Sequence, residues 1–265
     1  MIKLIVTDMD GTFLNDRHEI NEEFWPIFED LKKREITFAV ASGRQYYNLL
    51  KNFDKIKNEI IFVAENGTYI VEKEKELYVN SIDKEHVKEL VKIGRKIKSA
   101  NVVLCGKKAA YVETDEPELI SEIEKYYERY EILKDVLESE IEDEILKVTF
   151  CDLEGSELNV YPHFKEFEKE FKVAVSGKIW LDITNFNANK GVAVEKLQKM
   201  LNVTKDETMV FGDYLNDLEM MESGTYSFAM GNAHHKLKEV ANYIADTNNN
   251  GGVVKTIKEY VLKDK

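Results

Sequence analysis

The sequence lacks any long apolar run. Its first ten residues, MIKLIVTDMD, do not form the extended hydrophobic stretch of a signal peptide. No other segment approaches the length needed to cross a bilayer. These absences predict a cytoplasmic protein with no membrane partner.

Cysteine is scarce. The chain has two cysteines, Cys105 and Cys151, each within a strand-like stretch, and neither belongs to a Cys-x-x-Cys motif or a Cys/His cluster. Zinc binding is therefore not indicated, and two cysteines provide no framework of disulfide bonds. We expect each of them to be a buried free thiol.

Positive charge is in deficit. Thirty-seven Lys and Arg residues accompany 50 Asp and Glu residues, which gives a formal net charge of −13 at pH 7. Such a chain repels a phosphate backbone, so nucleic acid is not expected as a partner. Residues 115–144 contain thirteen acidic residues and three basic ones. This segment provides either solvated helix faces or an acidic docking surface.

The sequence does contain a regular alternation of short apolar runs and amphipathic segments. Of its 265 residues, 43% are hydrophobic, which is enough for a sizeable core. The order indicates βαβ units and a parallel sheet, and Asn66-Gly67 predicts a tight turn into an antiparallel hairpin. The pattern comprises strand-like runs at 3–7, 36–41 and 60–64 and helical spacing at 21–34 and 45–52.

From residue 83 the pattern changes, and it changes back near residue 187. The simplest account is a Rossmann-like, doubly wound α/β core made of residues 1–82 and 187–265, with an α+β cap of residues 83–186 inserted into it. Asn189 can cap the helix that reopens the core. The cap pattern comprises a helix near 87–97, strands NVVLCG and AAYVET, an acidic helical stretch from 118 to about 130, strand ILKVTFCD, a helix near 164–171, and strands KVAVS and IWLDIT.

Polar residues directly follow the predicted strands of the core, where open parallel sheets bind their ligands. They are Asp8, Asp10, Ser42, Gly43, Asn66 and Asp213. Carboxylates gathered at neighbouring strand ends need a cation, and a set of oxygen ligands favours Mg²⁺. The Ser42 hydroxyl, the Gly43 amide and the ammonium group of Lys190 are groups that bind phosphoryl oxygens.

Four motifs in the chain carry a family resemblance. DMDGT, ASGR, NANKG and GDYLND occur in the order of the four signature motifs of the haloacid dehalogenase (HAD) superfamily. Together with ENG, MGNA and NNNGGV, the set resembles the Cof-like sugar-phosphatase branch, and the resemblance spans both core segments. The insertion after the third strand is similar to the larger cap of that branch, called type IIB.

The resemblance implies a role for each matching residue. Asp8 corresponds to the nucleophile that becomes an acyl phosphate, and Asp10 to the general acid that protonates the leaving alkoxide and later deprotonates water. Mg²⁺ is expected on the Asp8 carboxylate, the Asp10 carbonyl and Asp213. The remaining assignments are phosphoryl binding by Ser42, the Gly43 amide and Asn216, charge neutralisation by Lys190, and support of the metal or the lysine by Asp217.

Asp10 also distinguishes branches of the superfamily. Dehalogenases lack an acid two residues after the nucleophile and P-type ATPases have threonine there, so Asp10 implies a hydrolase. We expect Mg²⁺-dependent hydrolysis of a small phosphorylated metabolite, such as a sugar phosphate, by a monomer or weak homodimer. Two alternatives stay open. One is a phosphomutase on the same core, and the other is a non-catalytic module that binds protein through the acidic cap.

Other conspicuous residues are assigned no chemistry. His234 and His235 are adjacent, so on a helix they point to different faces, and we expect a capping role at the surface. Tyr126, Tyr127 and Tyr130 predict one half-buried face of a cap helix.

Overall fold

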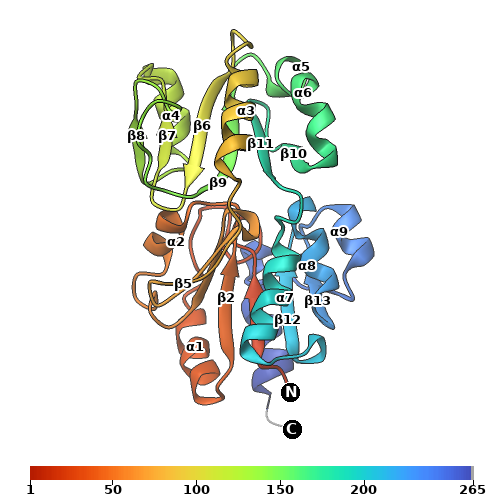
Figure 1. Ribbon diagram of the computed structural model, residues 1–265. Helices are drawn as coiled ribbons and strands as arrows, with labels where there is room; N and C mark the ends of the chain where they lie inside the picture. Colours follow the sequence, from red (N-terminus) through yellow and green to blue (C-terminus); the bar gives the residue numbers. More distant parts are fainter. Residues whose placement is uncertain (264–265) are drawn as a thin grey trace. The chain divides into compact units, whose positions relative to one another are not determined.

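The computed structural model describes residues 1–263, which form two compact units (Figure 1). The first unit contains Met1–Gly43, Asn52–Leu77 and the C-terminal segment from Asn189, and the second contains Arg44–Lys51 and Tyr78–Ala188. Residues 44–51, which the sequence analysis assigned to the core, thus cluster with the second unit. The domain boundaries at 82/83 and 186/187 stay predictions.

The first unit is built on an eight-stranded sheet in the order β14-β13-β12-β1-β2-β3-β4-β5. Neighbouring strands from β14 through β3 are parallel, and β3 pairs with β4 antiparallel. The parallel sheet and the hairpin predicted from the sequence are therefore confirmed. The strands are β1 (Leu4–Thr7), β2 (Thr37–Ala41), β3 (Ile61–Ala64), β4 (Tyr69–Glu72), β5 (Lys75–Val79), β12 (Thr208–Gly212), β13 (Tyr226–Ala229) and β14 (Tyr243–Ile244).

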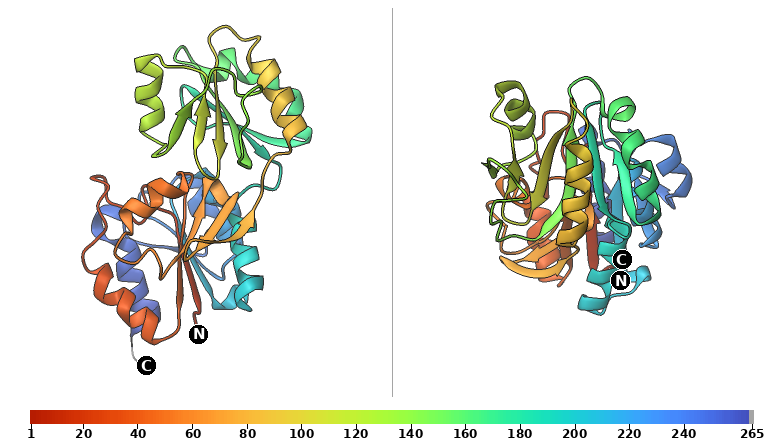
Figure 2. Two further views of the ribbon diagram at one scale, coloured as in Figure 1. Left: turned by 60° about the vertical axis from the view of Figure 1, so that its left-hand side comes forward. Right: turned by 45° about the horizontal axis from the view of Figure 1, so that its top comes forward.

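Helices cover both faces of this sheet, which makes the unit Rossmann-like. Helix α1 lies on one face and α7 on the other (Figure 2). Apolar residues at helical spacing explain α1, because the four of them that repeat every three or four positions are all buried. Within residues 1–263, no helix combines the length and apolarity needed to cross a membrane. The helices are α1 (Phe24–Lys33), α7 (Lys190–Leu201), α8 (Leu218–Glu222), α9 (His235–Val240) and α10 (Gly252–Ile257), whereas α2 (Tyr46–Asn52) belongs to the second unit up to Lys51.

Strand β1 lies at the centre of the sheet, between strands that are distant in sequence. Thr7, its last residue, is paired with Phe211 of β12 on one side and Val40 of β2 on the other. Because all three strands are parallel, they end at the same edge. The register therefore brings the residues after position 7, after position 41 and after position 212 to one edge of the first unit.

The second unit is built on a six-stranded sheet in the order β10-β11-β9-β6-β7-β8. Its strands pair antiparallel, except that β7 and β8 are parallel. The unit is an α+β domain, as predicted. Its elements are strands β6 (Asn101–Gly106), β7 (Ala110–Val112), β8 (Tyr130–Ile132), β9 (Ile145–Cys151), β10 (Phe171–Val175) and β11 (Trp180–Asn185), and helices α3 (Lys84–Gly94), α4 (Pro117–Glu124), α5 (Ser156–Asn159) and α6 (Tyr161–Phe164).

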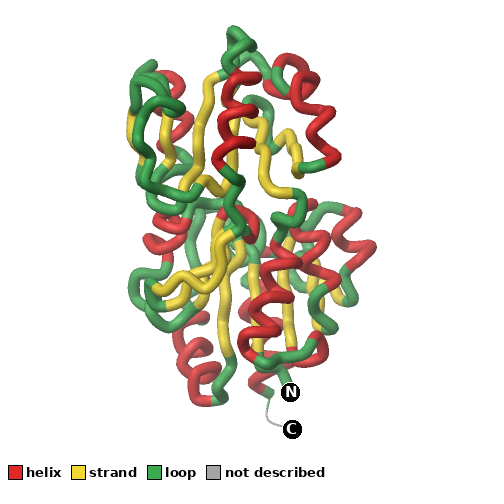
Figure 3. Tube along the Cα trace, viewed as in Figure 1, coloured by secondary structure: helices red, strands yellow, loops and turns green. Residues whose placement is uncertain are grey.

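The central strands of this sheet are buried on both faces, so two hydrophobic clusters form. Figure 3 shows the strands of the sheet and the helices that flank them. Along β9, Val148 and Phe150 belong to the cluster under α3 and α6, whereas Cys151 belongs to the cluster under α4. Side chains alternate between the faces of a strand, which explains this division. Burial on both faces explains why apolar residues predominate at both odd and even positions of β9, ILKVTFC.

One helix predicted in this unit is shorter than expected. The acidic helix ends at Glu124, and Tyr130 opens β8. The expected tyrosine face is therefore wrong: Tyr127 is buried with its hydroxyl 3.0 Å from the Cys105 Sγ, while Tyr126 is exposed. At Tyr130, pairing with a neighbouring strand outweighs local helical preference. The helix expected near 164–171 is present over most of that segment, as the end of α6 at Phe164 and a 3₁₀ helix over Lys165–Lys169, and Phe171 opens β10.

Gly94 provides a test of packing in the second unit. A Cβ atom at this position would lie 2.0 Å from the Phe150 Cε1, in a ring that stacks on Phe164. Replacing glycine by alanine ordinarily stabilises a helix by about 1 kcal/mol, but overpacking a core costs about 1–3 kcal/mol. We therefore expect Gly94→Ala to lower the free energy of unfolding by about 1–2 kcal/mol, as measured by urea denaturation.

Gly177 is the matched control for this substitution. A Cβ there would make an ordinary 3.6 Å contact with Trp180. Gly177→Ala should leave the unfolding midpoint nearly unchanged. Gly94→Ala with a midpoint at or above that of the wild type would contradict the packing of Phe150 described above.

Candidate active site

Asp8 stands at the centre of a polar network at the edge where β1 and β12 end. Its backbone N–H donates to the Phe211 carbonyl at 2.9 Å, which continues the pairing of the two strands by one residue. The Asp8 side chain is buried, with 5% of the residue exposed. A carboxylate in this position is fixed by the sheet itself rather than by a mobile loop.

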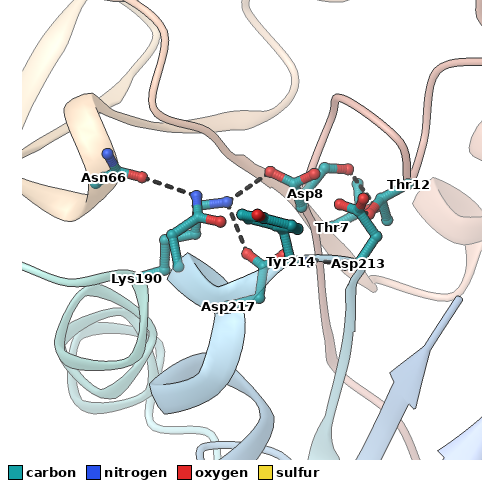
Figure 4. A network of polar contacts seen from close by, with 9 residues as sticks. Thr7, Asp8, Thr12, Asn66, Lys190, Asp213, Tyr214 and Asp217 are labelled. Carbon is teal, nitrogen blue, oxygen red and sulfur yellow. Dashed lines mark hydrogen bonds and ion pairs between the residues drawn. The ribbon is translucent and has the colours of Figure 1, made fainter. Parts of the chain in front are cut away.

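Lys190 joins two carboxylates in this network (Figure 4). Its Nζ donates to the Asp8 Oδ1 at 2.5 Å and to the Asp217 Oδ1 at 2.7 Å, and the lysine is fully buried. Lys190 is the first residue of α7, whose N-cap Asn189 accepts a hydrogen bond from the Val192 N–H. The predicted cap therefore aims the lysine at the edge of the sheet.

Asp217 ties the loop after β12 to Lys190. While its Oδ1 accepts from the lysine, its Oδ2 accepts from the backbone N–H groups of Asp213 and Tyr214 at 3.0 and 3.2 Å. Gly212 makes room for it, because a Cβ there would lie 2.6 Å from the Asp217 Cβ. Both oxygens of Asp217 are thus engaged in holding other groups in place.

Asp213 lies on the opposite side of Asp8 from Lys190 (Figure 4). Its Oδ1 accepts a hydrogen bond from the Thr12 hydroxyl at 3.1 Å, which connects the loop after β12 to the loop after β1. Gly11 allows this approach. It has a φ of +76°, and a Cβ on it would lie 2.3 Å from the Asp213 Oδ2.

The network carries more negative than positive charge. Burial raises the pKa of Asp8 well above its usual value, and the nearby Asp217 and Asp213 raise it further, whereas Lys190 lowers it. Burial, assisted by Asp217, also raises the pKa of Asp213 to about 6. For Lys190, burial alone would lower the pKa, but the charges of Asp217 and Asp8 outweigh it and raise the pKa. One ammonium group thus faces three carboxylates.

These carboxylates suit a divalent cation. Ligand oxygens of Asp8, Asp213 and Asp217 lie within 4.8 Å of one another. Since the two oxygens of Asp217 already accept from Lys190 and backbone N–H groups, Asp8 and Asp213 are the better ligands. An oxygen-only set with excess negative charge fits Mg²⁺ by donor type and by electrostatics.

The groups predicted to bind a phosphoryl moiety lie on neighbouring loops. Ser42 follows β2 and is buried, and its backbone N–H donates to the Val63 carbonyl at 2.9 Å. Asn216, in the loop after β12, is exposed and donates from its Nδ2 to the Asn66 Oδ1 at 3.0 Å. Gly43 lies against Asn66 as well, because a Cβ on Gly43 would be 3.1 Å from the Asn66 Nδ2.

Asp10 differs from Asp8 in its exposure. Its side chain is 44% exposed, and its Oδ1 lies 3.5 Å from the His18 Nδ1. A carboxyl group that passes protons between a leaving group and water needs such access to solvent.

Several residues that support the site were given no role from the sequence. Asn232 Nδ2 donates to the Gly11 carbonyl at 2.7 Å, and its Oδ1 accepts from the Asn248 N–H at 3.0 Å. Asn248 in turn donates to the Leu14 carbonyl at 3.1 Å. These asparagines anchor the loop after β1, and their motifs, MGNA and NNNGGV, were the available signal. Thr12, within DMDGT, was also missed.

Comparison with known proteins agrees with this arrangement. Residues 5–257 match the sequence profile of haloacid dehalogenase-like hydrolases. The 5-amino-6-(5-phospho-D-ribitylamino)uracil phosphatase YbjI of Escherichia coli is 34% identical over 265 residues, covering 99% of this chain and 97% of that protein.

Solved structures share the fold over nearly the whole chain. The crystal structure of a Streptococcus mutans protein has a TM-score of 0.87 at 30% identity and covers 99% of this chain and 100% of that one. A HAD subclass IIB sugar phosphatase has a TM-score of 0.79 at 20% identity, covering 97% and 98%, a likeness of fold. The chain therefore belongs to the haloacid dehalogenase-like hydrolases and is an enzyme of their phosphatase type.

Proposed function

We propose that this enzyme is a Mg²⁺-dependent phosphatase that transfers the phosphoryl group of a small phosphomonoester first to Asp8 and then to water. The observation that carries the proposal is the buried Asp8 carboxylate at a strand end, hydrogen-bonded to Lys190 at 2.5 Å and flanked by Asp213. A nucleophile, a compensating cation and a metal ligand therefore meet in the first unit.

The two half-reactions follow from these positions. A carboxylate oxygen of Asp8 attacks phosphorus, the bond from phosphorus to the leaving oxygen breaks, and Asp10 donates the proton that makes the leaving group an alcohol. In the second step Asp10 accepts a proton from water, the resulting oxygen attacks phosphorus, and Asp8 is released with inorganic phosphate. Asp10 ends the cycle protonated, as it began.

Charge neutralisation makes the attack of one anion on another feasible. Lys190 holds the Asp8 carboxylate, which supports a role in neutralising the incoming phosphoryl group. In this proposal Ser42, the Gly43 amide and Asn216 donate hydrogen bonds to the phosphoryl oxygens. A bound Mg²⁺, held by Asp8, Asp213 and the Asp10 carbonyl, would supply further positive charge on the transferred group. Asp217 acts through Lys190, by keeping it charged and aimed.

The substrate belongs, in our proposal, to the phosphorylated sugars and sugar alcohols. The 34% identical relative acts on a ribityl phosphate, which supports this class. Every residue proposed for the chemistry lies in the first unit. We therefore propose that the inserted cap, residues 83–186, selects the leaving group.

A substrate panel tests the proposal. Purified protein is assayed with p-nitrophenyl phosphate, hexose phosphates, ribitol 5-phosphate and the ribitylaminouracil phosphate of the relative, in Mg²⁺ and in EDTA. We expect metal-dependent release of inorganic phosphate. Isomerised sugar without phosphate release would indicate a phosphomutase instead, and a folded protein that turns over none of these substrates would refute the proposal.

Metal binding has its own test, because Mg²⁺ should stabilise the wild type but not the Asp213→Asn variant. Its raised pKa means that the metal-free folded state holds more protons than the unfolded state between pH of about 4 and 6. Metal-free stability is therefore lost as the pH rises through that window. In EDTA at pH 7.5, Asp213→Asn should unfold at the same or a higher temperature than the wild type.

Addition of Mg²⁺ should stabilise the wild type selectively. At ten times its dissociation constant, the ion stabilises a one-site protein by about 1.4 kcal/mol. We expect that gain for the wild type and none for Asp213→Asn, both followed by thermal denaturation. Equal gains for the two proteins would remove Asp213 from the metal site.

A further inference from the structure

The turn between β3 and β4 has an unusual backbone. Glu65, Asn66 and Gly67 have φ angles of +47°, +54° and +97°. Glycine adopts this region freely and asparagine tolerates it, but three consecutive positive φ angles are rare in a chain of L-residues. Such a conformation persists only where the surrounding contacts determine it.

Asn66 makes those contacts with two predicted phosphate-binding loops. Its backbone N–H donates to the Ser42 carbonyl at 2.9 Å, and its side chain lies against Gly43, where even a methyl group would be tight at 3.1 Å. On its other side, the Asn66 Oδ1 accepts from the Asn216 Nδ2 at 3.0 Å. One residue therefore touches the loop after β2 and the loop after β12.

The same turn also adjoins the helix that carries Lys190. A Cβ on Gly67 would lie 2.4 Å from the Asn189 carbonyl oxygen, so only glycine allows this approach. Asn189 is the N-cap of α7, and Lys190 follows it directly. Figure 4 shows Asn66 on the Lys190 side of the network.

We propose that the Glu65–Gly67 turn is a positioning element of the active site, in which Asn66 sets the side chain of Asn216 relative to Ser42 and Gly43. This inference rests on the proposed function, because it assigns the turn to the phosphate-binding groups of that site. Asn66 is a positioning residue, since it acts through Asn216.

The energetic argument concerns the freedom of Asn216. An exposed asparagine side chain samples several rotamers, and a donor that must meet a phosphoryl oxygen loses effect when it is misplaced by about 1 Å. The hydrogen bond to Asn66 restricts it to one arrangement. Asn66 makes this hydrogen bond from a backbone with a φ of +54°.

The test is a double-mutant cycle with Asn66→Gly, Asn216→Ala and the two combined. Glycine keeps the left-handed backbone and removes only the amide. Two quantities are measured for each protein, namely kcat/KM for p-nitrophenyl phosphate and the affinity for inorganic phosphate by titration calorimetry. We expect each single variant to lose about tenfold in both quantities, since one hydrogen bond contributes about that factor.

The combined variant decides whether Asn66 acts through Asn216. If it does, the double variant is at most about twofold worse than Asn216→Ala alone, because the two residues form one unit. Losses that multiply to about a hundredfold would overturn the inference. So would a single Asn66→Gly variant that equals the wild type.

Asn202 is the matched control for loss of an asparagine from a left-handed position. It has a φ of +54° at the C-terminal end of α7. Asn202→Gly should leave kcat/KM and phosphate affinity unchanged, and a loss like that of Asn66→Gly would overturn the inference by showing a general backbone effect.

Phosphate binding separates this inference from the proposed function. If the wild type binds phosphate but hydrolyses no ester, and the variants show the expected coupling in phosphate affinity, the phosphatase mechanism is refuted and the role of the turn is kept. If the wild type hydrolyses esters but the losses of the two single variants multiply in the double variant, the role of the turn is refuted and the phosphatase mechanism is kept. A folded wild type that neither binds phosphate nor hydrolyses esters would refute both.

Discussion

Asp8→Asn is expected to reduce kcat at least about 1,000-fold while the protein folds as the wild type does. The amide oxygen cannot form an acyl phosphate, so the covalent step is lost and only binding and electrostatic effects remain. Steady-state assays with p-nitrophenyl phosphate in Mg²⁺ measure the loss, and mass spectrometry checks that no asparagine has deamidated back to aspartate.

The stability of this variant has a predictable sign. Burial raises the pKa of Asp8. Between the ordinary carboxyl pKa and this raised value, the metal-free folded state binds more protons than the unfolded state. The free energy of unfolding therefore falls as the pH rises through that interval. Asparagine removes this penalty and leaves Lys190 paired with Asp217. In EDTA at pH 8, Asp8→Asn should therefore be at least as stable as the wild type.

Asp115, an exposed residue of the second unit, provides the control substitution. Asp115→Asn should retain full activity and wild-type stability. If Asp8→Asn kept more than a tenth of the wild-type turnover after deamidation had been excluded, Asp8 would not be the nucleophile. Protein binding that survived in an inactive Asp8→Asn variant would instead favour a separate docking role.

Lys190→Met is expected to damage both folding and turnover. Lys190 is fully buried and holds Asp8 and Asp217 at 2.5 and 2.7 Å. Methionine retains much of the apolar stem but leaves the two carboxylates without their shared cation, and removal of one member of a buried charge cluster costs about 3–5 kcal/mol. Urea denaturation at pH 7.5 in EDTA should show a loss of that size.

The loss of stability should shrink as the pH falls, because protonated carboxyl groups no longer need the lysine. Turnover should fall at least about 1,000-fold, since the nucleophile and the transferred oxygens would repel each other. Lys199→Met, exposed on the same helix, is the control and should change neither property by much. Equal stability of Lys190→Met and the wild type would show that the ion pairs of Lys190 do not stabilise the fold.

Local signals in the sequence were sufficient wherever a helix or strand boundary depends on adjacent residues. Asn189 caps α7 as predicted. His234 also has the expected capping role, since its Nδ1 accepts from the Lys236 N–H at 3.2 Å. Each of these features is decided by side chains within four positions of one another.

The order of strand-end motifs also allowed the network to be anticipated. Because parallel strands present their carboxyl ends at one edge, residues after β1 and β12 had to be close once the sheet was recognised. The structure places Asp8, Lys190, Asp213 and Asp217 in one network.

The errors arose where distant pairing decides the structure. The acidic stretch up to Tyr130 has a helix-like composition, yet Tyr130 opens β8 because β7 offers an unpaired edge. The pairing of Tyr130 with Ala110 joins β8 to a strand on the far side of helix α4, and no local pattern of residues shows it.

The sequence alone determined the alternating strands and helices, the caps, and which carboxylates follow which strands, because these depend on periodicity and on neighbouring residues. Only the tertiary structure decided that Asp217 commits both oxygens to its neighbours and that Gly11 makes room for Asp213. It alone brought Asn66 against Asn216, a residue 150 positions later in the sequence. Such contacts depend on register and close approach between segments, which a linear pattern does not encode.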